Sequence, residues 1–193
     1  MALEIVAHRG ASDEAPENTR EAVEAAWKAG ADAVEVDVRL TADGKLAVIH
    51  DEDAKRTTGT GAVVAKSTLE DLRKLDAGSW KGPRWKGCRI PTLEEVLATV
   101  PRGKRLFVEV KCGAEAVPEL ARVLRESGRA PREAVVIGFD PETMAAARRI
   151  RAAGLELHVW TVDDPEVARR LRALGVDGIT TNRPAALRRA IEG

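Results

Sequence analysis

Charged residues stand at regular spacing inside two valine-rich segments of this chain. Glu35 and Asp37 lie two apart in "VEVDV", residues 34–38. Glu109 and Lys111 lie two apart in "VEVK", residues 108–111. Residues two apart in a β-strand point to the same side of a sheet, so each charged pair shares one face and the valines share the other. Because unpaired carboxylates are costly to bury, this pattern indicates a function rather than core packing.

The three acidic residues of these segments suit a divalent cation. Carboxylates that converge cannot all ionise without a compensating positive charge. A hard cation bound through oxygen is the simplest remedy, and both Mg²⁺ and Ca²⁺ fit an all-carboxylate set. We therefore predict a metal site made by Glu35, Asp37 and Glu109, with the choice between the two ions left open.

Two histidines end other apolar segments and suit proton transfer. His8 is followed by Arg9, and His50 is followed by Asp51, which we interpret as a turn or orienting residue. A lone histidine is more often structural, but two at separate strand ends fit acid and base roles on either side of a phosphorus centre. Arg9 and Lys111 would add positive charge, and these groups together with a metal suit a phosphate oxyanion.

Short β-branched segments and helical patterns alternate along the chain. We predict strands over residues 3–8, 33–39, 45–50, 105–111, 134–139, 155–161 and 176–180. Such βα alternation indicates a parallel sheet, either open and doubly wound or closed into a barrel. No dinucleotide-binding glycine motif follows the first strand. The polar residues gather at the carboxyl ends of several strands, so we expect an α/β fold of the TIM (β/α) barrel type.

Capping signals predict where the helices begin and end. The pattern "NTREAVEAAWKAG" predicts a helix that starts near residues 17–19 and ends at Gly30, with Glu17 and Asn18 at the rim of the site. Two capping boxes are predicted, Ser67 with Glu70 and Thr92 with Glu95. Asp-Pro pairs open two further helices, "DPETMAAARRIRAAG" and "DPEVARRLRALG".

We predict one domain, residues 1–193, in which the alternation of strands and helices is interrupted at two places. Residues 51–91 are rich in glycine and are expected to form an insertion that caps one end of the sheet. Between Phe139 and Leu155 there is room for one helix only, so the barrel is shortened by one βα unit there. It closes with fewer strands, stays open, or is completed by another chain, as in a homodimer. The stretch "RLTADG" is too short for a crossover helix, so we expect that helix to be irregular or missing.

Composition excludes several classes of function. Lys+Arg and Asp+Glu both number 31, and Tyr is absent, which argues against a broad nucleic-acid surface. No long apolar run predicts stable membrane insertion or a secretion signal. Cys88 and Cys112 lack metal-ligand spacing and are interpreted as free thiols of a reducing compartment, so we expect a cytoplasmic protein.

The ordered motifs resemble the glycerophosphodiester phosphodiesterase family. They are "HRG" at 8–10, "PENT" at 16–19, "VEVDVRLTADGKLAVIHD" at 34–51, "VEVK" at 108–111, "VWTVDD" at 159–164 and "GVDGITTNRP" at 175–184. The resemblance spans almost the whole chain. It departs from the family at Asp163, where Asn is frequent, and at Asn182, where Asp is frequent.

The resemblance implies a TIM barrel related to phosphatidylinositol phospholipase C and a role in glycerol and lipid metabolism. It implies metal-dependent hydrolysis of a small-molecule glycerophosphodiester to glycerol 3-phosphate and an alcohol. The implied roles are a divalent metal on Glu35, Asp37 and Glu109, general acid and base at His8 and His50, phosphate contacts at Arg9 and Lys111, and an alcohol-pocket wall at Trp160.

Two alternatives to this function stay open. A lysophospholipase D-type lipid phosphodiesterase would fit an apolar rim at Trp80, Trp85 and Val63–Val64. A non-catalytic phosphodiester-binding barrel would fit the missing unit, although the chain retains both histidines and all three carboxylates.

Overall fold

Six of the seven strands in the described part of the sheet are parallel and follow one another in chain order. The computed structural model describes residues 5–138, 156–159, 162, 164–176 and 178–179. The parallel strands, in their order across the sheet, are β1 (Val6–His8), β2 (Ala33–Leu40), β4 (Arg105–Val110), β5 (Ala134–Gly138), β6 (Glu156–Val159) and β7 (Gly178–Ile179). Each crossover leads to the next neighbour, which is the connectivity of a (β/α) barrel wall.

Strand β3 (Leu46–Val48) differs from the expectation of a parallel strand. It pairs antiparallel with β2, and Leu40 lies opposite Leu46. The turn between them closes by a hydrogen bond from the Thr41 N–H to the Lys45 carbonyl, and Gly44 has a positive φ of 71°. Antiparallel strands need only a tight turn, whereas parallel strands need a long crossover. The predicted parallel direction was therefore wrong, and the predicted lack of a regular helix is confirmed.

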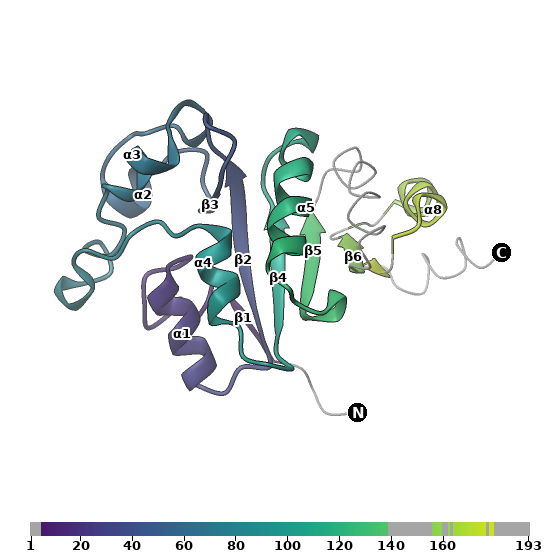
Figure 1. The fold of residues 1–193 in the computed structure, drawn as a ribbon, viewed down its shortest axis with the longest axis horizontal. Helices are drawn as coiled ribbons and strands as arrows, with labels where there is room; N and C mark the ends of the chain where they lie inside the picture. The colour runs from purple at the N-terminus through teal and green to yellow at the C-terminus, as the bar shows by residue number, and fades with distance from the viewer. Residues whose placement is uncertain (1–4, 139–155, 160–161, 163, 177, 180–193) are drawn as a thin grey trace.

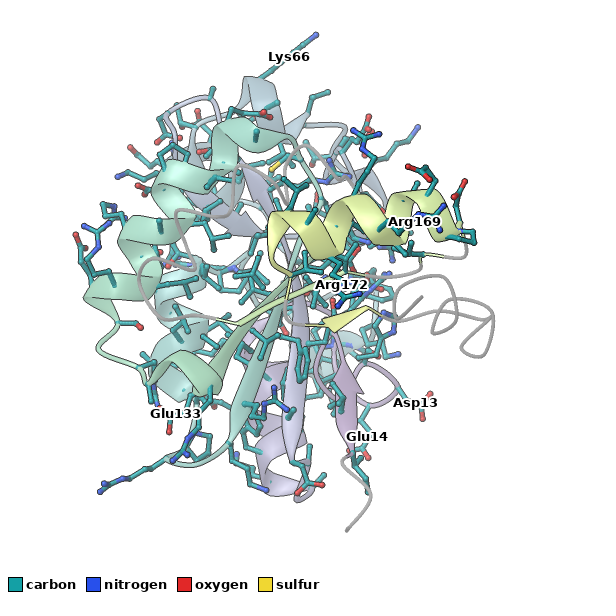
Figure 2. The ribbon with its side chains drawn as sticks, turned by 90° about the vertical axis from the view of Figure 1, so that its right-hand side faces the viewer. Asp13, Glu14, Lys66, Glu133, Arg169 and Arg172 are labelled. Atoms are coloured by element: carbon teal, nitrogen blue, oxygen red, sulfur yellow. The ribbon has the colours of Figure 1, made fainter. Side chains whose placement is uncertain are left out.

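Helices cover the outer face of the sheet, where the core lies. They are α1 (Arg20–Lys28), α4 (Leu93–Thr99), α5 (Val117–Glu126) and α8 (Pro165–Leu174). The alternate residues Val34, Val36 and Val38 of β2 are fully buried in one hydrophobic cluster with the apolar side chains of these helices. Charged side chains such as Lys66 and Arg169 lie at the surface instead (Figure 2). The period-two pattern of the strand thus sends its valines to the helices and its acids to the opposite face.

Most capping predictions agree with the structure. The Thr92–Glu95 capping box is present at α4, and Asp164 caps α8, which ends at Gly175. The predicted Ser67–Glu70 box was wrong. The Ser67 hydroxyl donates to the Val63 carbonyl, so the cap of α3 (Leu69–Arg73) shifts by one residue to Thr68, which accepts from Asp71 N–H. The predicted helix over residues 140–154 lies outside the described residues.

Residues 51–91, here called the cap, pack with Ala47 and Ile49 in a second, smaller hydrophobic cluster. The cap contains α2 (Lys55–Thr58), α3 and the short 3₁₀ helices η1 (Val64–Lys66) and η2 (Pro83–Trp85). The cluster comprises Ala47, Ile49, Ala54, Val64, Leu72, Ala77 and Ile90. Helices α2 and α3 lie near the carboxyl end of β2 (Figure 1). The cap therefore lies at the end of the sheet where the candidate residues were predicted.

The described sheet is an open path rather than a closed ring. In the part of the chain that the structure describes, β1 pairs only with β2, and β7 pairs only with β6. Ile5 and Val6 at this edge are 60% and 41% exposed, although apolar residues of a closed barrel would be covered. The described part is thus a partial barrel, in agreement with a shortened chain. None of its helices is long and apolar enough to cross a bilayer.

Candidate active site

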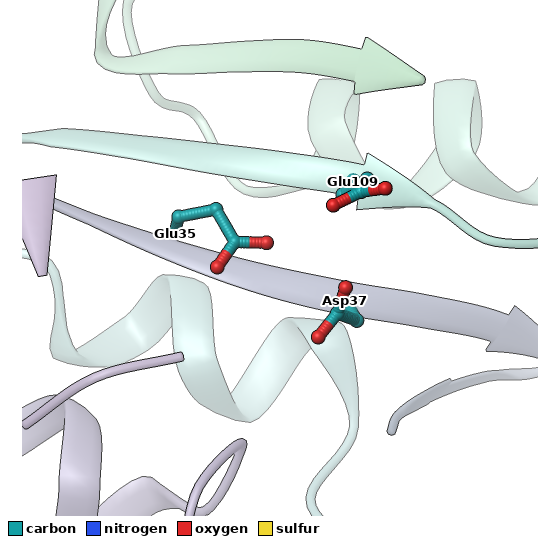
Figure 3. A group of neighbouring side chains, drawn as sticks. All are labelled: Glu35, Asp37 and Glu109. Atoms are coloured by element: carbon teal, nitrogen blue, oxygen red, sulfur yellow. The ribbon is translucent and has the colours of Figure 1, made fainter. Parts of the chain in front are cut away.

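Three carboxylates converge on the inner face of the sheet. The register places Asp37 of β2 opposite Glu109 of β4, and Glu35 lies one alternate position earlier on β2. One oxygen from each lies within 4.8 Å of the others, and all three residues are buried. Figure 3 shows the three carboxylates close together, with Glu35 and Asp37 on one strand and Glu109 on its neighbour. The structure thus brings together the three predicted metal ligands, here called the acidic triad.

The surroundings of the acidic triad do not balance three ionised carboxylates. Burial and the nearby Asp37 charge raise the pKa of Glu35 to about 8. Burial also raises the pKa of Glu109, although its hydrogen bond from Lys111 acts in the opposite direction. Glu35 Oε1 and Asp37 Oδ1 are buried without a hydrogen-bond donor. Buried carboxylate oxygens that accept no hydrogen bond fit a divalent cation that accepts oxygen ligands.

Two cationic side chains flank the triad. Lys111 Nζ lies 2.5 Å from Glu109 Oε1 and 3.4 Å from Asp37 Oδ1. Arg9 Nε lies 3.2 Å from Asp37 Oδ2. Two positive charges face three carboxylates, so the cluster can accept further positive charge. The same two groups are donors suited to the oxygens of a phosphate.

A tight turn at the end of β1 brings Arg9 to the site. Arg9 adopts a left-handed conformation with φ 57°, and Gly10 follows with φ 81°. A Cβ at Gly10 would lie 2.6 Å from the backbone of Ala22 in α1, so only glycine fits there. The Arg9 N–H donates to Glu35 Oε2 at 3.0 Å. The "HRG" motif therefore fixes both a backbone donor and a guanidinium beside the triad.

Asn18 contributes more to the site than its predicted place at the rim. Its Nδ2 donates to Asp37 Oδ2 at 2.7 Å, and its Oδ1 accepts from the Asp37 N–H at 3.1 Å. It is buried and has a positive φ of 57°. The sequence held one signal for this role. Asn18 and Thr19 can both cap a helix, and since Thr19 caps α1, Asn18 is not needed as the cap.

The two histidines differ in how firmly they are held. His8 Nε2 lies 3.9 Å from Glu35 Oε2, and its side chain is 67% exposed. Partial burial and the Arg9 charge lower the pKa of His8, so it can accept a proton near neutral pH. His50 Nδ1 lies 2.7 Å from Asp51 Oδ1, which leaves Nε2 for proton exchange. Asp51 thus has the orienting geometry that was predicted for it.

Seven of the eight predicted site residues lie in the described part of the chain, at the carboxyl ends of neighbouring strands. His50 lines a small pocket together with Glu17 and Asn18, and Asn18 is hydrogen-bonded to Asp37 of the triad. Trp160, the eighth, lies outside the described residues, as do Asp163 and Asn182. A separate cleft of roughly 420 Å³ is lined in part by Arg39, Val63 and Cys112, and Arg39 donates to the His50 carbonyl.

Comparisons with known proteins agree with this arrangement. The model of the glycerophosphoryl diester phosphodiesterase family matches residues 8–148 and 129–186. A glycerophosphodiester phosphodiesterase of Caldanaerobacter subterraneus subsp. tengcongensis is 33% identical, over 95% of this chain and 95% of that protein. That alignment spans 234 positions against the 193 residues of this chain, so the relative contains segments that this chain lacks.

Solved structures are similar over nearly their whole length. An Oleispira antarctica phosphodiesterase in complex with its product sn-glycerol-3-phosphate has a TM-score of 0.72 and 26% identity, covering 99% of this chain and 97% of that one. A glycerophosphodiester phosphodiesterase from Agrobacterium tumefaciens has a TM-score of 0.66 and 29% identity, covering 96% and 99%. Motifs, geometry and both comparisons lead to one conclusion: the chain belongs to the glycerophosphoryl diester phosphodiesterase family.

Proposed function

We propose that this protein is a metal-dependent phosphodiesterase that hydrolyses glycerophosphodiesters to sn-glycerol 3-phosphate and an alcohol. The observation that carries the proposal is the buried acidic triad, in which two oxygens accept no hydrogen bond, with Arg9 and Lys111 beside it. The product bound in the Oleispira antarctica relative supports the substrate class.

Glu35, Asp37 and Glu109 would hold the divalent metal, for which Mg²⁺ and Ca²⁺ both suit the ligand set. When bound, the metal supplies a Lewis acid that polarises the phosphoryl group. Asn18 orients Asp37, and the Arg9 N–H orients Glu35, so two of the three ligands are held by neighbouring donors. Such outer partners fix the direction of metal ligands.

Arg9 and Lys111 bind the phosphate oxygens in this proposal. Lys111 now donates to Glu109, and Arg9 pairs with Asp37 and Glu17, so both cations are held at the site by carboxylates. Charge-assisted hydrogen bonds to a phosphate are among the stronger ones in proteins. They would stabilise the negative charge that develops on the phosphoryl oxygens.

His8 and His50 divide the proton transfers. One histidine removes the proton from the neighbouring glycerol hydroxyl, which attacks phosphorus to give a cyclic phosphate. The other histidine protonates the oxygen of the departing alcohol. Their roles then reverse as water opens the cyclic phosphate to glycerol 3-phosphate. Either histidine can act first on this scheme.

The remaining parts of the chain have supporting roles in the proposal. We treat residues 1–193 as one domain in which residues 51–91 cap the site. Trp160 would form a wall of the alcohol pocket, by resemblance to the family. A homodimer is supported by the open strand edges at β1 and β7 among the described residues. A cytoplasmic location is supported by Cys88 and Cys112, which are both free thiols.

Release of glycerol 3-phosphate from glycerophosphocholine tests the function. We expect release with Mg²⁺ or Ca²⁺, loss of release with EDTA, and recovery when excess metal is restored. Binding of glycerophosphocholine without release under any metal would instead favour a non-catalytic phosphodiester-binding barrel.

A lipid substrate is the second candidate. Trp80 and Val63 of the cap are 41% and 38% exposed, so the cap presents apolar surface that an acyl chain could contact. A lysophospholipase D-type enzyme would turn over lysophosphatidylcholine faster than glycerophosphocholine. Trp80→Ala should then lower turnover of the lipid and leave that of glycerophosphocholine unchanged.

A further inference from the structure

One arginine of the cap joins two carboxylates that lie outside the acidic triad. Arg56 in α2 donates from both terminal nitrogens to Glu17, with both contacts at 2.8 Å. Its third nitrogen, Nε, donates to Asp51 Oδ2 at 2.6 Å. A guanidinium presents its donors in a rigid planar fork, so Arg56 fixes the two carboxylates relative to each other.

The two carboxylates connect Arg56 to residues of the proposed reaction. Asp51 Oδ1 lies 2.7 Å from His50 Nδ1, and Glu17 Oε1 accepts from the Arg9 guanidinium at 2.8 Å. The contacts thus run without a break from His50 through Asp51, Arg56 and Glu17 to Arg9. We call these five residues the cap network.

We propose that Arg56 is a positioning residue that holds Asp51 in the orientation in which it accepts the Nδ1–H bond of His50, a role that rests on the proposed function. With the proton fixed on Nδ1, the Nε2 of a neutral His50 carries the lone pair that takes up the substrate proton. Arg56 itself stays one residue removed from the reacting atoms.

The exposure of the cap network favours orientation over stability. Arg56 and Asp51 side chains are 44% and 30% exposed, and ion pairs of this kind contribute little to folding. An aspartate this accessible can rotate about its side-chain bonds unless a partner holds it. Burial alone would raise the pKa of Asp51, but the bonds from Arg56 and His50 lower it, so Asp51 remains an acceptor.

A merely structural role makes different predictions. Arg56 links the cap to the loop after β1, and a loosened cap would weaken substrate binding and lower stability. Loss of positioning would lower kcat at nearly unchanged KM, because the proton is transferred only in the chemical step. The two roles therefore separate in the kinetic constants and in the state of the His50 ring.

The test uses the metal-loaded full chain with glycerophosphocholine as substrate. The variants are Arg56→Ala, Arg56→Lys, Asp51→Asn and the Arg56→Ala/Asp51→Asn double variant. Arg122→Ala is the matched control, since Arg122 is 34% exposed and pairs with three carboxylates on and beside α5. Nitrogen chemical shifts of the histidine rings, assigned with His50→Ala, report the tautomer of His50 directly.

We expect Arg56→Ala to lower kcat about tenfold with KM within about twofold of wild type. The His50 ring should change from the Nδ1–H tautomer to a mixture, and Arg56→Lys should recover only part of kcat. In the Asp51→Asn background the Arg56 change should have no further effect, because the arginine acts through that carboxylate. Arg122→Ala should match wild type in kcat and in ring shifts.

Three kinetic results would each overturn the role of Arg56. They are wild-type kcat in Arg56→Ala, an equal loss in Arg122→Ala, and an Arg56 effect of full size in the Asp51→Asn background. An unchanged His50 tautomer in Arg56→Ala also excludes it. If the wild-type protein releases no glycerol 3-phosphate, the proposed function fails, yet the ring shifts still decide whether Arg56 orders His50.

Discussion

The acidic triad and the cap network both contain carboxylates beside arginine, but they differ in hydrogen bonding and in the direction of the carboxylate pKa shifts. In the triad, Glu35 Oε1 and Asp37 Oδ1 are buried without a hydrogen-bond donor, and burial raises the pKa of Glu35. In the cap network, all four carboxylate oxygens of Glu17 and Asp51 have partners. Burial raises the pKa of both, but the combined hydrogen bonds and charges of Arg56 with Arg9 at Glu17, and of Arg56 with His50 at Asp51, lower both pKa values overall.

This difference distinguishes a site that requires a ligand from one that is complete without it. The triad lies on the inner face of adjacent strands, where three carboxylates converge in a buried space. The network lies in loops and a short helix, where one arginine reaches two acids. Converging buried charge is tolerated where a bound cation completes it, whereas the paired acids of the network serve to hold geometry.

The largest expected effects come from the two histidines, His8 beside the acidic triad and His50 in the cap network. His8→Ala and His50→Ala should each lower turnover by about 10²–10⁴-fold, because each removes one proton-transfer group. Metal affinity, measured by calorimetry, should stay near wild type because neither side chain belongs to the triad. Near-normal turnover in either variant would contradict the assignment of that histidine.

The next largest effect is expected from Glu35→Gln, which tests whether the acidic triad, and not the cap network, binds the metal. It preserves the acceptor for the Arg9 N–H but removes a charged metal ligand, so we expect turnover about 10³-fold lower, given several kcal/mol of metal stabilisation. Metal titration should show weakened binding. The matched control is Glu17→Gln in the cap network, which should retain metal affinity. Equal metal affinity in both variants would remove the distinction.

The third prediction concerns how the free energy of unfolding of the metal-free protein changes with pH. The pKa of Glu35 is about 8 when folded and 4.5 when unfolded, so the folded state binds this proton more tightly. Stability must therefore fall as pH rises from 4.5 through 8, by roughly 3–5 kcal/mol from this group. Glu35→Gln lacks this loss. In urea unfolding from pH 5 to 9, the free energy of unfolding of Glu35→Gln should rise relative to that of wild type. If both free energies changed with pH in parallel, the raised pKa of Glu35 would be disproved.

For Glu17 of the cap network, the free energy of unfolding should change with pH in the opposite direction, and this effect should be the smallest. The pKa of Glu17 is lowered when folded, so its contribution is present above pH 4.5 and disappears as pH falls through the folded value. Glu17→Gln should cost about 1 kcal/mol at pH 7, since the surrounding ion pairs are partly exposed. The difference from wild type should shrink near pH 3. A difference that grows toward acid pH would refute the pairing.

Much of the site could be predicted because its signals are local. The period-two pattern of "VEVDV" and "VEVK" sends acids to one face and valines to the other, and parallel strands bring their equivalent ends together. Capping chemistry is also local, so Thr92, Asp164 and Gly175 end or begin helices as predicted. The predicted Ser67 cap was wrong because two adjacent hydroxyl residues, Ser67 and Thr68, could both cap α3. Only Thr68 accepts a hydrogen bond from the first turn of the helix.

Contacts between distant segments required the tertiary structure. Asn18 reaches Asp37 across 19 positions, and Arg56 reaches Glu17 across 39, and no short pattern encodes either pair. The direction of β3 depends on the register it finds against β2, which a run of apolar residues leaves undetermined. The sequence alone thus determined the residue types, their faces and the order of the motifs, because these follow from the backbone repeat. The tertiary structure decided which side chains hold those residues in place, because that depends on packing between remote parts of the chain.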